Sequence, residues 1–215
     1  EGSASALLRF DACFRQGATP TTRPDLVAHR GAAIHTMADL EAAFKGIDLA
    51  KTPVTLDAGA GGLAAAKAFL ALTNAPATGT VLGLDPVGAM ASAGLPSAMA
   101  DAWYDFAAGF DGLALNASSA AAFDAGASEA EELGYLLSSA LVYLRAIEAR
   151  GLSVADAVAR ISFTLAISQD QFMTIAKARA ARALWAAVLE HVGAAEASAG
   201  MRLHGVTAER MFTTR

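Results

Sequence analysis

The stretch Arg160–Trp185, RISFTLAISQDQFMTIAKARAARALW, decides the fold class of this 215-residue chain. Its first part, Ile161–Ile167, is apolar without clean alternation and rich in β-branched and aromatic side chains, which is typical of a strand covered on both faces in a parallel sheet. Three polar residues, Ser168–Asp170, follow at the strand's carboxyl end, and Ser168 or Asp170 can cap the helix predicted next. The stretch therefore predicts a strand–turn–helix unit, and folds made of such units bind ligands at the carboxyl ends of their strands.

The helix predicted over residues 171–191 carries apolar residues at three- and four-residue spacing, and because most of them are alanine the helix is expected to lie close against a sheet. These residues are Met173, Ala176, Ala180, Ala183, Leu184 and Ala187. Three cations, Lys177, Arg179 and Arg182, are then expected on a solvated face or in salt bridges between subunits. They could also meet a nucleotide phosphate.

The remaining chain alternates short apolar runs with capped amphipathic segments. We expect strands over 6–10, 54–57, 80–84, 113–116 and 202–206, and helices over 63–73, 97–110 and 129–149. Residues 11–35 show no sustained period and are expected to form a loop. Thr36 with Asp39, and Ser128 with Glu131, have the spacing of capping boxes. This alternation predicts a parallel sheet with covering helices, either an open doubly wound sheet or a partial barrel of about six βα units.

Composition excludes several classes of protein. The net charge of −5 gives no basic surface for nucleic acid. No apolar run approaches the roughly 20 residues that a membrane span needs, and no signal peptide is visible, so we expect a cytoplasmic protein. Cys13 is the single cysteine, which predicts neither a disulfide framework nor a cysteine metal cluster, and we predict no metal ligand among the site residues. The chain begins at Glu1 without methionine and is expected to be a fragment of a longer polypeptide.

Polar residues at the predicted carboxyl ends of the strands are the candidate site, because they would converge on one mouth of a barrel. They are Asp57, Asp85, Asn116, Ser168, Gln169, His204 and Thr207. Each also has a structural interpretation: an aspartate there often caps the following helix, and an asparagine often lies in a turn. The glycine run 59–62 lacks the spacing and the lysine of a phosphate-binding loop and predicts a tight turn.

The central stretch resembles the barrel domain of the methylmalonyl-CoA mutase family, whose corresponding segment reads much like RISF-x-x-AI-x-x-x-x-FM-x-x-AK-x-RAAR-x-LW. The resemblance runs from about Val54 to Thr207. It implies one TIM-barrel-like segment over 1–215, with an irregular part over 1–52 and βα repeats over 53–207. It also implies adenosylcobalamin as cofactor, bound by a domain outside these residues. Residues 202–207, RLHGVT, resemble the family's R-x-H-x-Q-T strand end, so His204 would face the corrin ring.

Departures from the family pattern argue against catalysis by this chain. The family stretch Y-H-x-x-E-A-G-A corresponds to residues 120–127, where Ala120 and Ala121 replace the tyrosine and histidine. The G-T-I-Q-N-D motif appears as residues 79–85 without its amide pair, and Val206 replaces the glutamine of the corrin-facing strand. The cobalamin-ligating D-x-H-x-x-G motif is absent from the sequence. We therefore predict no catalytic residue in this chain.

The chain is more similar to the small, non-catalytic subunit of heterodimeric bacterial mutases than to the large one. This resemblance predicts a partner that supports a catalytic subunit in the isomerisation of methylmalonyl-CoA and succinyl-CoA, with adenosylcobalamin bound by that catalytic subunit. Two alternatives remain: a catalytically active acyl-CoA mutase chain, and an acyl-CoA or nucleotide binding module without isomerase activity.

Overall fold

The computed structural model describes residues 5–212, which fall into two compact units, Glu1–Leu115 and Asn116–Arg215. The first unit holds β1 (Ala6–Arg9), β2 (Val54–Asp57), β3 (Val81–Leu84) and the first half of β4 (Leu113–Ser118). The second holds the rest of β4, β5 (Ile161–Ile167) and β6 (Leu203–Thr207). In each unit neighbouring strands follow the order of the chain.

This strand order distinguishes the two sheet architectures that the sequence leaves open. A doubly wound sheet reverses its strand order at a switch point, whereas a (β/α)₈ barrel adds each parallel strand beside the preceding one. In the described residues the order β1 to β6 has no reversal, and the pairings β1–β2, β2–β3, β3–β4 and β5–β6 are parallel. The predicted parallel α/β class and partial barrel are confirmed.

Helices follow the strands in both units. The first unit has α1 (Ala12–Arg15), α2 (Met37–Ala43), α3 (Gly62–Leu72), α4 (Pro86–Ala93) and α5 (Ala100–Gly109), with 3₁₀ turns at Pro24–Leu26, Gly59–Gly61 and Ser97–Met99. The second has α6 (Ala120–Asp124), α7 (Glu129–Glu148), α8 (Val154–Ala159) and α9 (Gln171–His191), with 3₁₀ turns at Ala195–Gly200 and Glu209–Met211. Within the described part of the chain, no helix combines the length and apolar composition needed to cross a bilayer.

The predicted helix starts are confirmed by their capping contacts. Ser128 accepts from the Glu131 N–H while Glu131 reaches back to the Ser128 N–H, which completes the capping box of α7. Thr36 and Asp39 form the same box at α2. Asp170, one of the two candidates, caps α9 by accepting from the Met173 N–H at 2.9 Å.

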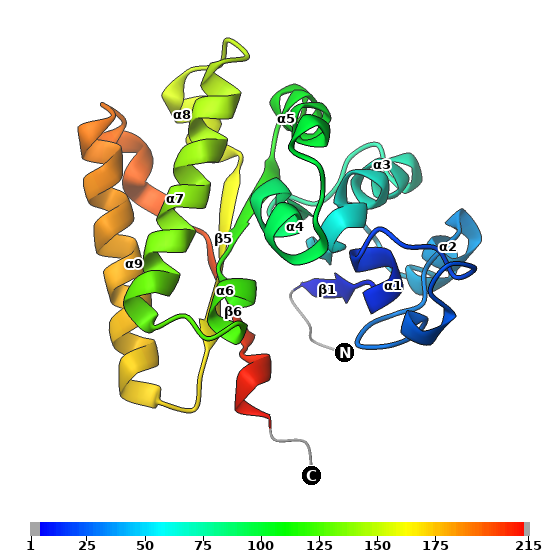
Figure 1. The fold of residues 1–215 in the computed structure, drawn as a ribbon. Helices are drawn as coiled ribbons and strands as arrows, with labels where there is room; N and C mark the ends of the chain where they lie inside the picture. The colour runs from blue at the N-terminus through cyan, green and yellow to red at the C-terminus, as the bar shows by residue number, and fades with distance from the viewer. Residues whose placement is uncertain (1–4, 213–215) are drawn as a thin grey trace. The chain divides into compact units, whose positions relative to one another are not determined.

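Aromatic contacts anchor the core of each unit. In the first, Phe44 and Phe69 meet edge to face with ring centroids 5.5 Å apart. In the second, Phe163 of β5 meets Trp185 of α9 at 5.0 Å, also edge to face. α7 lies beside α9 (Figure 1), and its buried apolar residues are Leu136, Ala140, Tyr143, Leu144 and Ile147.

The buried face of α9 differs from the predicted one. Its buried residues are Lys177, Ala181, Trp185 and Leu189, a single row at four-residue spacing, whereas Met173 and Leu184 are 43% and 44% exposed. Burying Trp185 and Leu189 removes far more apolar area from water than burying a row of alanines does. The prediction that Lys177 lies on a solvated face is therefore wrong.

Gly83 provides a test of the β2–β3 packing. Its φ of +70° is unfavourable for residues with a side chain, and an added Cβ would lie 1.9 Å from the Leu56 carbonyl oxygen of the neighbouring strand. We expect Gly83→Ala to lower the free energy of unfolding by at least about 2 kcal/mol. Urea unfolding of the full chain, followed by circular dichroism, measures the change.

Gly134→Ala is the matched control, because Gly134 lies inside α7 and an added Cβ meets nothing within 4 Å. Alanine there should raise the free energy of unfolding by about 0.5–1 kcal/mol. Equal effects of the two substitutions would contradict the tight strand packing.

Candidate functional site

The two predicted aspartates of the first unit both have structural partners. Asp57 ends β2, and its Oδ2 lies 3.2 Å from Nε of Arg9, its register partner on β1. Asp85 caps α4 by accepting a hydrogen bond of 2.9 Å from the Gly88 N–H. The helix-cap interpretation therefore holds for Asp85, whereas Asp57 pairs with a cation.

In the second unit a row of polar side chains crosses the sheet. Asn116 of β4 accepts hydrogen bonds at Oδ1 from Ser162 Oγ (3.3 Å) and Thr164 Oγ1 (3.1 Å) of β5. Thr164 is in register with His204 of β6. Because register partners point to the same face of a sheet, His204 extends the row. We call Asn116, Ser162, Thr164 and His204 the polar row.

The polar row lies on the sheet face opposite α9. Successive side chains of a strand point to opposite faces, and Phe163, between the two hydroxyl residues of the row, packs against Trp185 of α9. The row therefore faces the side that is the interior in a (β/α)₈ barrel. His204 is exposed there, while Ser162 is buried.

The other predicted residues of this unit are not part of the row. The Ser168 hydroxyl and backbone N–H lie 3.3 Å from Thr174 Oγ1 in the first turn of α9. Gln169 is exposed beside the helix cap. Thr207 is in register with Ile167 and lies on the opposite pleat from His204.

The positions of the missing tyrosine and histidine are accessible. Ala120 and Ala121 form the first turn of α6, directly after the carboxyl end of β4. Ala120 is half-buried and Ala121 exposed. Their methyl groups can neither donate a proton nor form a hydrogen bond. This turn therefore supplies no side chain for acid–base chemistry.

A buried ion pair fastens the helices around this turn. Lys177 Nζ of α9 contacts Glu132 Oε2 of α7, and both side chains are at most 1% exposed. The other carboxylate oxygen of Glu132 accepts from Ser119 Oγ (2.8 Å) and from the Ala166 N–H (2.9 Å). A charge buried this deeply must be paired and hydrogen-bonded. Both oxygens of Glu132 meet that requirement.

The same network holds α6 through Phe123. Lys177 Nζ lies 4.0 Å from the centroid of the Phe123 ring, and Arg210 Cζ lies 3.3 Å from it. Arg210 also donates to the carbonyl oxygens of Phe123 (2.7 Å) and Ala127 (2.9 Å). The helix bearing Ala120 and Ala121 is therefore held by cations from two other segments.

Sequence reasoning missed this network, although a signal for it was present. Lys177 begins the row that continues with Ala181, Trp185 and Leu189, so a lysine at the end of an apolar stripe was visible. Glu132, in the first turn of α7, had no such signal, because acidic residues are common there for the helix dipole alone.

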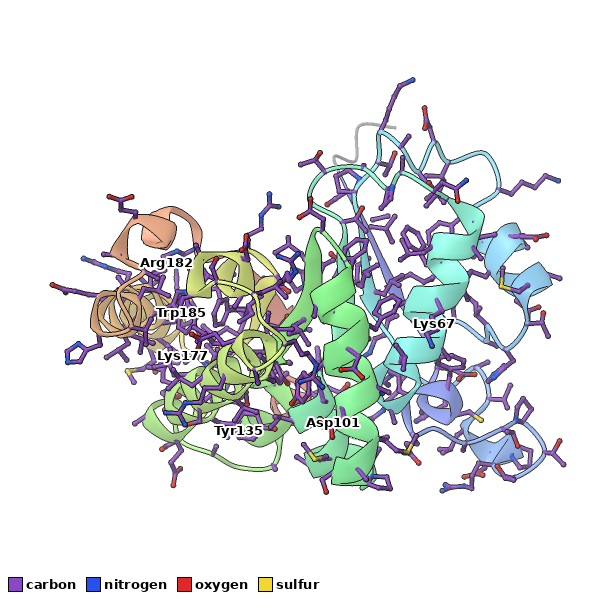
Figure 2. All side chains as sticks on the ribbon, turned by 90° about the horizontal axis from the view of Figure 1, so that it is seen from above. Lys67, Asp101, Tyr135, Lys177, Arg182 and Trp185 are labelled. Atoms are coloured by element: carbon purple, nitrogen blue, oxygen red, sulfur yellow. The ribbon has the colours of Figure 1, made fainter. Side chains whose placement is uncertain are left out.

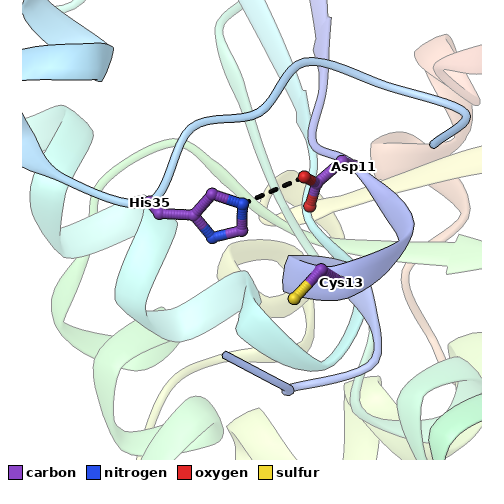
Figure 3. Close-up of side chains that lie close together, drawn as sticks. All are labelled: Asp11, Cys13 and His35. Carbon is purple, nitrogen blue, oxygen red and sulfur yellow. Dashed lines mark hydrogen bonds and ion pairs between the residues drawn. The ribbon is translucent and has the colours of Figure 1, made fainter. Parts of the chain in front are cut away.

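A second cluster, in the first unit, was also missed. Asp11, Cys13 and His35 bring one ligand atom each to within 4.8 Å of one another (Figure 3). His35 Nε2 lies 2.9 Å from Asp11 Oδ2. The prediction of a loop over residues 11–35 is wrong in part, because these residues contain α1 and a 3₁₀ turn.

The electrostatics of this cluster are set by burial and hydrogen bonds. Burial raises the pKa of Asp11, but hydrogen bonds from the N–H groups of Phe14 and Ala28 and from His35 outweigh it, so that the pKa is lowered overall. Burial, with the neighbouring Asp11 and Asp25 carboxylates, raises the pKa of the Cys13 thiol. An uncomplexed Cys13 is therefore a protonated thiol at neutral pH.

Adenosylcobalamin fits these residues poorly. The D-x-H-x-x-G motif occurs nowhere in the sequence. On β6, Val206 lies on the same pleat as His204 and is half-buried, so an isopropyl group stands where the family pattern has an amide. These residues alone do not supply a cobalamin site.

Replacing Lys177 by methionine tests the buried pair, because it leaves the Glu132 carboxylate without its cation. We expect the free energy of unfolding to fall by about 3–5 kcal/mol. The double variant Lys177→Met with Glu132→Leu should recover part of this loss. Urea unfolding provides the measurement.

Lys67 of α3, an exposed lysine labelled with Lys177 in Figure 2, is the control. Lys67→Met should change the free energy of unfolding by less than about 0.5 kcal/mol. Equal costs for the two lysines would contradict the assignment.

The chain is similar to known proteins along most of its length. The family model of methylmalonyl-CoA mutase matches residues 112–215. A methylmalonyl-CoA mutase small subunit of Streptomyces virginiae is 40% identical over 195 residues, which cover 86% of this chain and 32% of that protein. A probable small subunit of Mycobacterium tuberculosis strain H37Rv is 39% identical over 185 residues, 82% of this chain and 30% of that protein. The S. virginiae large subunit is 41% identical over 93 residues, 43% of this chain and 13% of that protein.

The chain thus spans about a third of the length of the small subunits that it matches. The segment matched by the family model holds β4 to β6, the polar row and the buried ion pair. The small-subunit matches extend into the first unit, and the parallel strand order agrees with the architecture that the resemblance implied. Together these findings establish that the chain belongs to the methylmalonyl-CoA mutase family.

Proposed function

We propose that this chain is part of a non-catalytic small subunit of an adenosylcobalamin-dependent acyl-CoA mutase. Its role is to support a catalytic large subunit that isomerises methylmalonyl-CoA and succinyl-CoA. The cofactor, which supplies the radical chemistry of such enzymes, is bound by that partner. The complex is a heterodimer.

The first turn of α6 carries this proposal. Its backbone follows the carboxyl end of β4, where barrel enzymes place their catalytic side chains. The position that corresponds to the family's histidine is the exposed Ala121. Proton transfer and hydrogen bonding to a substrate carbonyl both need a polar atom there. A chain without that atom cannot carry out this part of the reaction.

The extent of the matches supports the same assignment. Small subunits match 86% and 82% of the chain, whereas the large subunit of S. virginiae matches 43%. Val206, in place of the corrin-facing glutamine, is a further loss of a polar group.

The polar row favours a second candidate function, the binding of an acyl-CoA or nucleotide without isomerisation. Three of its members are joined by hydrogen bonds, and the exposed imidazole of His204 adds a donor or acceptor on the same face. Binding of coenzyme A to the full chain in the absence of any partner would favour this candidate over the support role.

Turnover by the full chain alone is the first test. With adenosylcobalamin and methylmalonyl-CoA supplied, we expect no more succinyl-CoA than a heat-denatured sample gives, because Ala120, Ala121 and Val206 lack the required groups. The same preparation mixed with its organism's large subunit is the positive control for cofactor and substrate. Succinyl-CoA formation by the isolated chain would show that it is a catalytic mutase.

Association with the large subunit is the second test. Light scattering of an equimolar mixture of the full chains should give the mass of a heterodimer. A stable interface of this kind typically buries more than about 1,200 Å². At 100 times the dissociation constant, binding stabilises the folded state by about 2.7 kcal/mol, so the thermal midpoint should rise. Unchanged mass and midpoint at micromolar concentrations would refute the pairing.

A further inference from the structure

The cluster formed by Asp11, Cys13 and His35 in the first unit has the composition of a metal site. It combines a carboxylate, a thiol and an imidazole, and their ligand atoms lie within 4.8 Å of one another (Figure 3). Asp11 and Cys13 are fully buried, and the His35 side chain is 15% exposed. None of the three takes part in the polar row or the buried ion pair of the second unit.

These donors suit zinc better than other common cations. Zn²⁺ binds cysteine sulfur, histidine nitrogen and carboxylate oxygen at about 2.0–2.3 Å, which places tetrahedral ligand atoms about 3.3–3.8 Å apart. The distance of 2.9 Å between His35 Nε2 and Asp11 Oδ2 is slightly shorter than this range. The upper limit of 4.8 Å on the distances among the three ligand atoms is about 1 Å longer than the range. Ca²⁺ and Mg²⁺ prefer oxygen ligands alone and would leave Cys13 without a role.

The carboxylate is already oriented as a ligand should be. Asp11 Oδ1 accepts from the Phe14 N–H at 2.9 Å, and Oδ2 accepts from the Ala28 N–H at 2.8 Å. Such hydrogen bonds fix the direction of ligating carboxylates in metal sites. Each carboxylate oxygen of Asp11 has a second lone pair, and that of Oδ2 now faces Nε2 of His35.

The surrounding backbone is also fixed in place. Asp11 N–H donates to the Ala32 carbonyl (3.0 Å), and Ala12 N–H donates to the His29 carbonyl (2.8 Å). Ala28 and Arg30 both adopt a left-handed conformation, with φ of +57°, which costs energy in residues other than glycine. The loop between α1 and α2 is thus held against the residues that carry the ligands.

We propose that Asp11, Cys13 and His35 bind one Zn²⁺ ion, with water as the fourth ligand. In the metal-bound form the ion replaces the hydrogen bond between Asp11 and His35, and the Cys13 thiol loses its proton to solvent. The ion joins α1 to the segment that leads into α2, which stabilises the first unit. This site is independent of the proposed mutase role, because it contains none of the residues used there.

Cobalt(II) titration of the chelator-treated full chain tests the site. Co²⁺ substitutes for Zn²⁺ and reports a thiolate ligand through a near-ultraviolet charge-transfer band and tetrahedral geometry through intense visible bands. We expect both bands at one equivalent per chain, and Zn²⁺ should abolish them by displacement. Absence of a charge-transfer band at millimolar Co²⁺ would overturn the proposal.

Variants assign the ligands. Cys13→Ser should remove the charge-transfer band, and His35→Gln should weaken Co²⁺ binding by more than about tenfold. His29→Gln is the matched control, because His29 is an exposed histidine of the same loop, and it should bind as the unmodified chain does. Circular dichroism verifies that each variant folds. If Cys13→Ser does not fold, the comparison of His35→Gln with His29→Gln decides the test. A band that persists in Cys13→Ser, or equal effects of the two histidine variants, would refute the site.

Discussion

The second unit depends on one buried carboxylate, that of Glu132. Its oxygens accept from Ser119, from the Ala166 N–H and from Lys177, so a single side chain joins the end of β4, β5, α7 and α9. The attraction within such a pair is largely offset by the cost of removing both charges from water. Its larger effect is on arrangement, because any other placement of α9 would leave a charge buried without a partner.

The arrangement set by Glu132 extends to the first turn of α6, which contains Ala120 and Ala121. Lys177 contacts the Phe123 ring, and Arg210 contacts the same ring and the carbonyl oxygens of α6. The frame of this turn is therefore intact, although Ala120 and Ala121 carry no functional group. An intact frame without these reactive groups is compatible with the supporting role proposed for the chain.

The first unit uses a buried carboxylate in a similar way. Asp11 caps α1 through the Phe14 N–H and also binds the Ala28 N–H and His35. The loop after α1 has little apolar content, so these hydrogen bonds, rather than a hydrophobic face, give it one conformation. The low pKa of Asp11 follows from the same contacts. In both units a buried carboxylate joins segments that are distant in the sequence.

The sequence by itself determined the strands, the long helices and their caps, because these depend on residues a few positions apart. Ser128 and Glu131, for example, needed only their spacing to start α7. It also predicted Asn116 and His204 at the carboxyl ends of strands, but this is wrong, since Asn116 lies inside β4 and His204 is the second residue of β6. Only the β5–β6 register brought the two residues onto one face. The buried face of α9 was decided by tertiary structure alone. Alanines lie on every side of this helix, so its periodicity is weak, and the partner of Lys177 lies 45 residues away in the chain.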